Sequence, residues 1–234
     1  MKPILSIITV IYNSAEDIEK TIRSVAVQLN EQIEFIIIDG GSTDGSLEIV
    51  KKYAKLVSYW VSEQDNGIYD AMNKGISKAS GTYIYFINAG DELINLPLEI
   101  LTNLNHQVIC FPVKLSSHEI RYPQFNGTIK TRNTLPHQGC FYKKTDNLKY
   151  NLKYRVFADF DLNQKLFKAK ISSAIFTEPI VALHAINGVS HNKSYLNEIF
   201  DVVEGNFGMY YRYLSKFYFK YYGIKQRLKK LKLL

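Results

Sequence analysis

This 234-residue sequence lacks long apolar runs, has few cysteines and, in one region, has no acidic residues. Its only cysteines, Cys110 and Cys140, exclude a disulfide framework and offer no metal-ligand spacing. No run of 18 apolar residues occurs, so no segment is predicted to span a bilayer. The first ten residues lack a small-residue cleavage site, which makes them a poor secretory signal. We therefore expect a cytoplasmic protein whose two thiols are buried.

Acidic residues are absent from residues 206–234, which hold eight lysines and arginines. The whole chain has a formal charge of +7, so the other residues together carry a charge of −1. A nearly neutral body argues against a nucleic-acid groove, and no nucleic-acid partner is expected. The basic residues instead predict contact between this segment and an anionic surface.

Apolar runs alternate with segments of helical period through the first hundred residues. We expect Ser14 to cap the first helix, with Asp17 as in a shortened capping box. Strands are predicted at Ile4–Ile11, Ile33–Asp39, Val57–Val61 and Thr82–Asp91, and helices at residues 14–29, Ser46–Leu56 and Asn66–Ala79. This order predicts a three-layer α/β/α fold with a mostly parallel central sheet.

The second half of the chain is less regular. Gln107–Leu115 is predicted to be a strand, residues 116–135 a loop or hairpin, and Asp159–Ala169 a helix.

The polar stretch DGGSTDGS runs from Asp39 to Ser46 and follows a predicted buried strand. Ligands of parallel sheets bind beyond the carboxyl ends of the strands, which is where this stretch and Asp91 would lie. Carboxylates beside glycine turns suit a metal-bound diphosphate. The simpler interpretation is an ordinary turn, in which Ser42 or Thr43 caps the next helix.

An ordered set of motifs is more specific than any one of them. It consists of LSIITVIYNSAEDIEKTIRSVAVQ, EFIIIDGGSTDGS, DNGIYDAMNKGI, GTYIYFINAGDEL and FADFDL. Together these motifs resemble the family 2 glycosyltransferases, which have the GT-A fold, and the resemblance covers residues 3–190. The likeness is greatest to bacterial enzymes that build capsule, O-antigen or exopolysaccharide. It implies a GT-A domain over residues 1–205, followed by a basic, aromatic, amphipathic segment at residues 206–234.

The resemblance implies a nucleotide-sugar pocket, with a UDP sugar as the expected donor and Asp91 as a ligand of Mg²⁺ or Mn²⁺. The residues implied to line the nucleotide and sugar are Thr9, Tyr12, Asn13, Asp39, Asp70, Asn73, Lys74 and Asn88. An exposed helix lysine is the alternative for Lys74.

Three positions depart from the family pattern, because Gly40, Gly90 and Ala158 stand where the family often has acids. Gly40 leaves the recognised base unassigned. Gly90 leaves Asp91 as the single acid of the metal motif, so a metal-independent variant stays open.

Asp159 matches the catalytic base of the family. It would take the proton of an acceptor hydroxyl that attacks the anomeric carbon, in a single displacement with inversion. Asp159 could instead be a helix N-cap, and Asp161 is the less favoured base. The segments PHQGCFYKK and NGVSHNK resemble those near the acceptor and the diphosphate, which implies contacts from His137, Gln138, His191 and Lys193. A structural histidine is the alternative for His137.

In the segment 206–234, basic and aromatic side chains fall on different faces of a predicted helix. Arg212, Lys216 and Lys220 recur every four residues, and another face holds Tyr210, Leu214, Phe217 and Tyr221. We expect this segment to bind an anionic membrane surface, with a helix packed on the domain or a homodimer contact as alternatives. The expected location is the cytoplasmic face of the plasma membrane, and the expected acceptor is a glycan on a polyprenyl diphosphate.

Two other functions stay open. One is a catalytically silent sugar-nucleotide-binding or scaffold protein of a polysaccharide assembly complex. The absence of acids at Gly40, Gly90 and Ala158 favours this alternative. A nucleotidyltransferase would share the fold but normally needs a glycine-rich, basic phosphate loop, which the sequence lacks.

Overall fold

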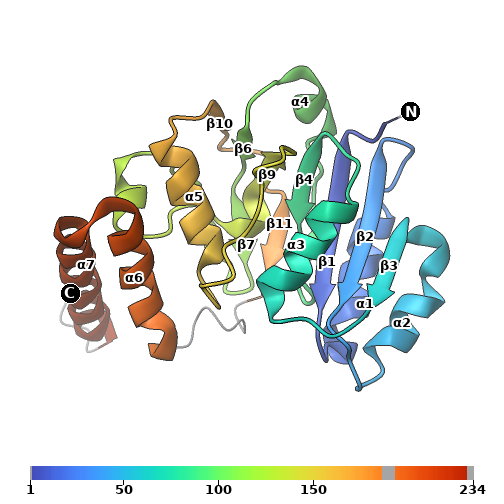
Figure 1. The fold of residues 1–234 in the computed structure, drawn as a ribbon, viewed down its shortest axis with the longest axis horizontal. Coiled ribbons are helices and arrows are strands. Elements are labelled where there is room, and N and C mark those ends of the chain that lie inside the picture. Colours follow the sequence, from blue (N-terminus) through green and yellow to red (C-terminus); the bar gives the residue numbers. More distant parts are fainter. Residues whose placement is uncertain (1, 186–192, 231–234) are drawn as a thin grey trace.

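The computed structural model describes residues 2–185 and 193–230 and contains two sheets with helices around them (Figure 1). The strands are β1 (Leu5–Ile11), β2 (Ile33–Asp39), β3 (Tyr59–Ser62), β4 (Tyr83–Phe86), β5 (Glu92–Leu93), β6 (Val108–Cys110), β7 (Val113–Leu115), β8 (Ile120–Arg121), β9 (Cys140–Lys143), β10 (Ser173–Ile175) and β11 (Ala182–His184). The helices are α1 (Ala15–Ala26), α2 (Ser46–Lys52), α3 (Ile68–Lys78), α4 (Leu98–Asn103), α5 (Ala158–Lys168), α6 (Leu196–Phe207) and α7 (Met209–Lys230).

The larger sheet has the strand order β10-β6-β9-β4-β1-β2-β3. β1 lies between β2 and β4 and is parallel to both, and β3 continues the parallel set. Only β9 runs antiparallel to its neighbours. The prediction of a mostly parallel central sheet is therefore confirmed, and the carboxyl ends of β2 and β4 lie at one edge.

Both faces of this sheet are covered by helices because its strands are apolar on both sides. Successive residues of a strand point to opposite faces, so Leu5 and Ile7 of β1 pack with α1 and α2, and Ile8 and Val10 pack with α3. The layer on the α3 side also holds α5 and α6. Because the strands carry apolar side chains on both sides, both faces of the sheet bury apolar side chains, and helices cover each face to give three layers.

The predicted strand Gln107–Leu115 is wrong as a single element. β6 joins the larger sheet, and β7 joins a second sheet of order β5-β11-β7-β8. Phe111 and Pro112 separate the two strands. Proline has no N–H to donate to a ladder, so the chain leaves one sheet there and enters the other. The second sheet places β11 beside the end of β4.

The predicted cap of the first helix is also wrong. Ser14 occupies the N-cap position of α1, but its side chain makes no capping hydrogen bond. The N–H of Ala15 donates to a carboxylate oxygen of Asp44 at 2.9 Å, and the N–H of Ser14 donates to Ser46 Oγ at 2.8 Å. The DGGSTDGS turn therefore accepts two backbone donors at the start of α1.

Several predicted boundaries shift by a few residues. The helix predicted at Ser46–Leu56 consists of α2 and a separate 3-10 turn at Ala54–Leu56. The last strand predicted in the first hundred residues ends at Phe86, and the chain then turns before Asp91. Across residues 2–185 and 193–230, no helix combines the length and the apolarity that crossing a membrane requires.

Candidate functional site

Asp39 ends β2 and is buried at the carboxyl edge of the parallel strands. Its carboxylate accepts hydrogen bonds from the hydroxyls of Ser42 and Ser62, both at 2.5 Å. The backbone N–H of Ser42 donates to it as well, at 3.2 Å. Ser42 therefore orients Asp39 and does not cap α2, which begins after Gly45 without a side-chain cap. The expectation that Ser42 or Thr43 caps the next helix is wrong.

The turn after β1 is joined to the DGGSTDGS turn. Asn13 Oδ1 accepts the N–H of Thr43 at 2.9 Å, and the N–H of Asn13 donates to Ser42 Oγ at 2.8 Å. Asn13 has a φ of 47°, a left-handed conformation that asparagine tolerates better than most residues. Two polar turns from neighbouring strands thus form one unit at the edge where a ligand would bind.

Asp65 lies against the backbone of Gly40. A Cβ atom on residue 40 would stand 2.3 Å from Oδ2 of Asp65, which is closer than non-bonded atoms approach. Asp65 Oδ1 accepts the N–H of Gly67 at 2.8 Å, which fixes the carboxylate in this place. A side chain at residue 40 would therefore require the Asp65 side chain to move, and in this structure Asp65 places a carboxylate beside Gly40 from a different segment.

Asp91 follows β4 and is buried. Its Oδ1 accepts the N–H of Ala185 at 2.9 Å and lies 2.9 Å from Nδ1 of His184. Its Oδ2 accepts a hydrogen bond from Nε2 of Gln138 at 2.8 Å, and its backbone oxygen accepts one from the hydroxyl of Thr21 at 2.8 Å. The end of β11 and the 3-10 turn at His137–Gly139 hold this carboxylate, and α1 holds the backbone of Asp91.

Gly90 stands where an acid would precede Asp91. Its φ is 90°, in the left-handed region that favours glycine, and its N–H donates to Thr21 Oγ1 at 3.0 Å. An aspartate at this position would be strained in the same turn. The missing acid therefore has a conformational reason in this fold.

Asp159 lies in the first turn of α5 and is about nine-tenths buried. The hydroxyl of Tyr69 is 3.0 Å from its Oδ1, and Asn133 Nδ2 donates to its Oδ2 at 3.1 Å. Phe157 is the N-cap of α5, so the interpretation of Asp159 as that cap is wrong. The contacts come from α3 and from the segment before β9, so distant parts of the sequence set the orientation of Asp159.

Ala158 and Asp161, the neighbours of Asp159 in α5, have structural contacts of their own. Ala158 is fully buried in the core, where a glutamate would place a charge among apolar side chains. Asp161 Oδ2 pairs with Lys165 Nζ at 2.6 Å, and its Oδ1 accepts from Asn206 at 2.9 Å. Asp161 therefore pairs within α5 and links α5 to α6, whereas the partners of Asp159 come from α3 and from the segment before β9.

Glu198 of α6 binds the backbone that leads into α5. Its carboxylate accepts the N–H groups of Arg155, Val156 and Phe157 at 2.9, 2.8 and 2.6 Å. These donors precede the helix that carries Asp159, and a negative charge at a helix start is favourable. Glu198 is thus a positioning residue for Asp159.

His137 and Gln138 are adjacent residues of the 3-10 turn at His137–Gly139. Gln138 contacts Asp91, and its backbone oxygen accepts the hydroxyl of Tyr85 at 2.8 Å. Burial lowers the pKa of His137 below its usual range, while the nearby negative charges of Asp159 and Asp91 oppose this shift. One short turn therefore connects the surroundings of Asp91 with those of Asp159.

Both ring nitrogens of His137 are buried and have no hydrogen-bond partner among the described residues. The hydroxyl of Tyr150 is in the same condition, and its ring centroid is 6.2 Å from that of His137. Unsatisfied buried polar groups are costly and call for a specific reason, such as a function.

The three predicted residues of α3 serve mainly to join segments. Asn73 accepts the N–H of Tyr150 at 2.8 Å and donates to its carbonyl oxygen at 3.0 Å. Lys74 Nζ contacts Glu63 and the carbonyl oxygen of Gln64, both at 2.9 Å. Asp70 accepts the N–H of Asn66 at 3.0 Å. Lys74 and Asp70 therefore fix the segment that carries Asp65.

The remaining predicted residues occupy varied positions. Thr9 and Asn88 each have a buried side-chain oxygen without a hydrogen-bond partner among the described residues, whereas Tyr12 is exposed. Lys193 begins the 3-10 turn at Lys193–Tyr195. His191 lies outside the described residues.

Metal binding can be tested on the donor set around Asp91. Within the described ranges, no three His, Cys, Asp or Glu side chains gather closely enough to hold a metal ion. Asp91 and His184 form a pair at 2.9 Å, and Mg²⁺ or Mn²⁺ commonly completes its shell with phosphate and water oxygens. The described residues therefore offer a divalent cation the pair Asp91 and His184, and a diphosphate and water would supply its other ligands.

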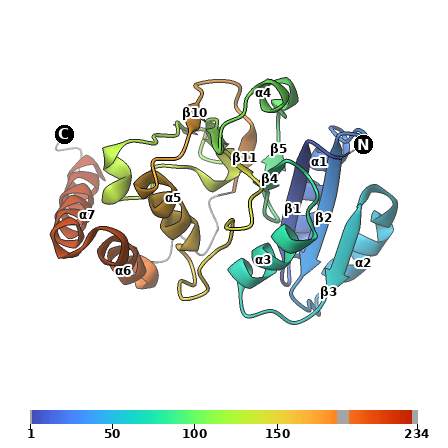
Figure 2. The same cartoon turned by 45° about the horizontal axis from the view of Figure 1, so that its top comes forward.

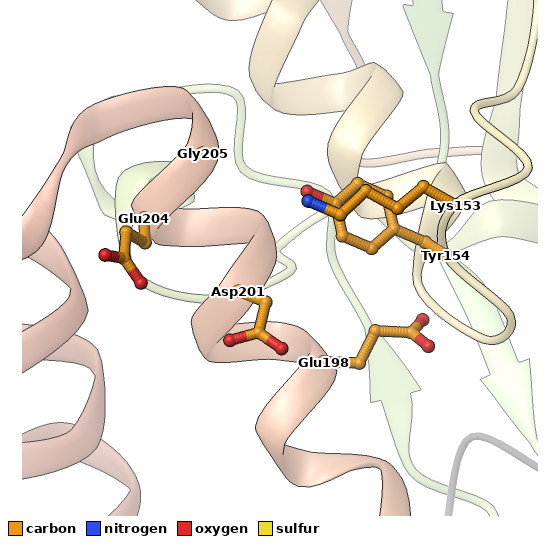
Figure 3. Close-up of a pocket in the computed structure, with 6 residues that line it drawn as sticks. All are labelled: Lys153, Tyr154, Glu198, Asp201, Glu204 and Gly205. Atoms are coloured by element: carbon orange, nitrogen blue, oxygen red, sulfur yellow. The ribbon is translucent and has the colours of Figure 1, made fainter.

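A separate surface pocket of about 420 Å³ is lined by Lys153, Tyr154, Glu198, Asp201, Glu204 and Gly205 (Figure 3). Its acidic side chains already have partners, because Asp201 and Glu204 bind Arg212 and Glu198 binds backbone. The pocket contains none of Asp39, Asp91 or Asp159. We therefore do not assign it as the substrate site.

Sequence reasoning missed several contributors, namely Tyr69, Asn133, His184 and Glu198. His184 ends β11 in a segment of thin likeness, and its position beside Asp91 depends on the second sheet. Asn133 and Glu198 act on residues far along the chain, and no local pattern marks them.

The family model described as "Glycosyl transferase family 2" matches residues 6–167. A PGL/p-HBAD biosynthesis glycosyltransferase of Mycobacterium bovis is 31% identical over 182 residues, which are 70% of this chain and 70% of that protein. An uncharacterized glycosyltransferase of Mycobacterium tuberculosis is 40% identical over 90 residues. That match covers 38% of this chain and only 34% of the relative.

Solved structures agree on the fold. TarS of S. aureus (residues 1–349, in complex with UDP) superposes with a TM-score of 0.70 at 17% identity, covering 88% of this chain and 65% of that one. Glucosyl-3-phosphoglycerate synthase of M. tuberculosis, solved with Mn²⁺ and UDP, has a TM-score of 0.62 at 15% identity, covering 89% and 81%. The fold is the expected GT-A type, and the chain belongs to glycosyl transferase family 2.

Proposed function

We propose that this chain transfers a sugar from a nucleotide sugar to an acceptor hydroxyl, and that the donor is a UDP sugar. The carrying observation is a series of contacts between Asp91 and Asp159. Gln138 donates to Asp91 and the adjacent His137 lies beside the ring of Tyr150. Tyr150 packs on Tyr69, whose hydroxyl is 3.0 Å from Asp159. UDP in the TarS and synthase structures supports this choice of donor, because those proteins share the fold.

In this proposal Asp159 is the general base. The acceptor oxygen forms a bond to the anomeric carbon while the bond between that carbon and the diphosphate oxygen breaks. The hydroxyl proton moves to Asp159, and the nucleoside diphosphate leaves with the bonding electrons, so the configuration inverts. Tyr69 and Asn133 hold the carboxylate for this proton transfer through their contacts to its two oxygens.

The leaving diphosphate would meet the edge where Asp91 and the β1–α1 turn lie. Asp91 and His184 would hold a divalent cation jointly with the diphosphate, and such a cation stabilises negative charge on the leaving group. Asp39 and Asp65 would face the nucleoside, because both carboxylates lie beside Gly40 at the end of β2. The same edge would thus bind the donor.

We further propose that the acceptor is a lipid-linked glycan at the cytoplasmic face of the plasma membrane. This part of the proposal relies on the surface of α7. Because the chain spans about a third of the first relative that it matches, the activity of the whole protein is also part of the proposal.

A release assay tests the proposal. Purified protein is incubated with UDP-, GDP- and other sugar nucleotides with and without Mn²⁺, and the free nucleoside diphosphate is measured with acceptor present. Release above the level of an Asp159→Asn variant supports transfer. Donor binding without release in either protein would instead identify a sugar-nucleotide-binding scaffold.

A further inference from the structure

Helix α7 packs against the body through one face. Ser215 is fully buried, and its hydroxyl donates to the carbonyl oxygen of Thr131 at 2.6 Å. Arg212 binds Asp201 at 2.7 Å and also pairs with Glu204 of α6. Tyr211 and Phe219 pack on the apolar core. These contacts fix the rotation of the helix and therefore decide which side chains face outward.

The outward face of α7 carries a stripe of large apolar and aromatic side chains. Its four aromatic side chains, Tyr210, Tyr213, Phe217 and Tyr221, are between 60% and 72% exposed. Spacings of three and four residues place them along one side of an α-helix. We define the α7 stripe as Tyr210, Tyr213, Leu214, Phe217, Tyr221 and Ile224.

Lysines flank the α7 stripe on both sides. At 100° per residue, Lys216 and Lys220 follow one border of the stripe and Lys225 lies at the other. All three are exposed. Residues 209–234 contain no Asp or Glu, so no acidic residue of this segment offsets these charges.

We propose that the α7 stripe lies flat on an anionic lipid bilayer. Aromatic rings settle at the level of the headgroups, and flanking lysines bury their methylene stems while their charged ends meet anionic lipid. Figures 1 and 2 show α7 at one end of the molecule, opposite β3 and α2, where a flat surface can approach it.

The charge pattern favours a bilayer over a second copy of the chain. Two copies joined through the α7 stripe would set lysines against lysines without acidic partners on either helix. Like charges placed opposite each other oppose association, whereas an anionic leaflet complements them.

Membrane binding stands independently of the transfer reaction. Its consequence for the acceptor rests on the proposed function: an α7 held at the surface keeps the site near a lipid-linked hydroxyl. A failed membrane experiment would leave donor release intact, and a failed release assay would leave membrane binding intact, so the two proposals are tested separately.

Flotation with lipid vesicles tests the proposal. The full chain is mixed with phosphatidylcholine vesicles that contain no phosphatidylglycerol or a substantial fraction of it, at low and high salt. We expect binding to the anionic vesicles only, and a large decrease at high salt. A double variant, Phe217→Ser with Tyr221→Ser, should bind at least tenfold more weakly, as should Lys220→Glu with Lys225→Glu.

Matched controls change the same residue types away from α7. Tyr122→Ser removes an exposed tyrosine, and Lys51→Glu with Lys55→Glu reverses two exposed lysines. Both should bind vesicles like the unchanged protein. Equal binding by the stripe variant, or no binding to anionic vesicles, overturns the proposal. A concentration-dependent dimer in sedimentation that the stripe variant abolishes would assign the stripe to self-association and overturn it too.

Discussion

The imidazole of His137 stacks on the ring of Phe86, with centroids 5.3 Å apart and ring planes at 23°. This stack fixes the imidazole in the core while both of its nitrogens lack partners among the described residues. The arrangement costs stability, and such costs are typical of functional sites. It also makes His137 a sensitive position for experiments.

Replacing His137 by phenylalanine should stabilise the fold. The variant His137→Phe keeps the stack on Phe86 and removes two unsatisfied buried nitrogens, so the free energy of unfolding should rise by about 1 kcal/mol. Urea denaturation measures this change. Turnover should fall at the same time if the ring contacts substrate. A loss of stability would show that the imidazole has partners in solution and contradict this account.

The same residue should make stability depend on pH. Burial holds the pKa of His137 below the unfolded value of about 6.5, so the unfolded chain takes up a proton first as the pH falls. Stability should therefore be complete above pH ~6.5 and decline below it, by at most about 1.4 kcal/mol per pH unit from this group. His137→Phe should flatten that slope, whereas His118→Asn at an exposed histidine should not.

We predict that Asp65 contributes to nucleotide binding, because its carboxylate lies beside Gly40, where the family often has an acid. An Asp65→Asn variant should bind UDP about tenfold more weakly, the effect of losing one hydrogen bond to a charged group. Isothermal titration calorimetry measures the affinity, with Asp146→Asn, an exposed aspartate, as the control. Unchanged affinity would remove Asp65 from the site.

Glu198 should affect both stability and turnover. Glu198→Gln weakens the acceptor of three backbone N–H groups ahead of α5, at a cost of about 1–3 kcal/mol in unfolding free energy. Because these groups lead into the helix of Asp159, kcat should fall while the donor Kd stays the same. Glu31→Gln at an exposed position is the control. A changed donor Kd with normal kcat would argue against the positioning role.

The two cysteines should be inert in the folded protein. Cys110 and Cys140 face each other across β6 and β9 with sulfurs 2.9 Å apart, both are buried, and burial raises the pKa of the Cys110 thiol. A thiol reagent should label neither cysteine at neutral pH and both in denaturant. Rapid labelling of the native protein would show that this part of the sheet opens.

Local patterns were sufficient for the first hundred residues, where β1, β2 and their helices follow from apolar runs and helical spacing. The sequence also placed Asp39 and Asp91 beyond strand ends. It could not reveal Asp65 beside Gly40 or His184 beside Asp91, because those contacts depend on how separate loops and a second sheet pack. The predicted cap of α1 was wrong for the same reason, because Asp44 accepts a hydrogen bond from the start of α1 out of a different turn.

The most direct test of the account compares the Asp159→Asn variant with the unchanged chain in paired measurements of UDP-sugar affinity and UDP release. We predict an unchanged donor Kd and a fall in kcat by about 10²–10⁴-fold, the usual contribution of a general base. Release at the normal rate by the variant would contradict the central claim that Asp159 accepts the proton of the acceptor.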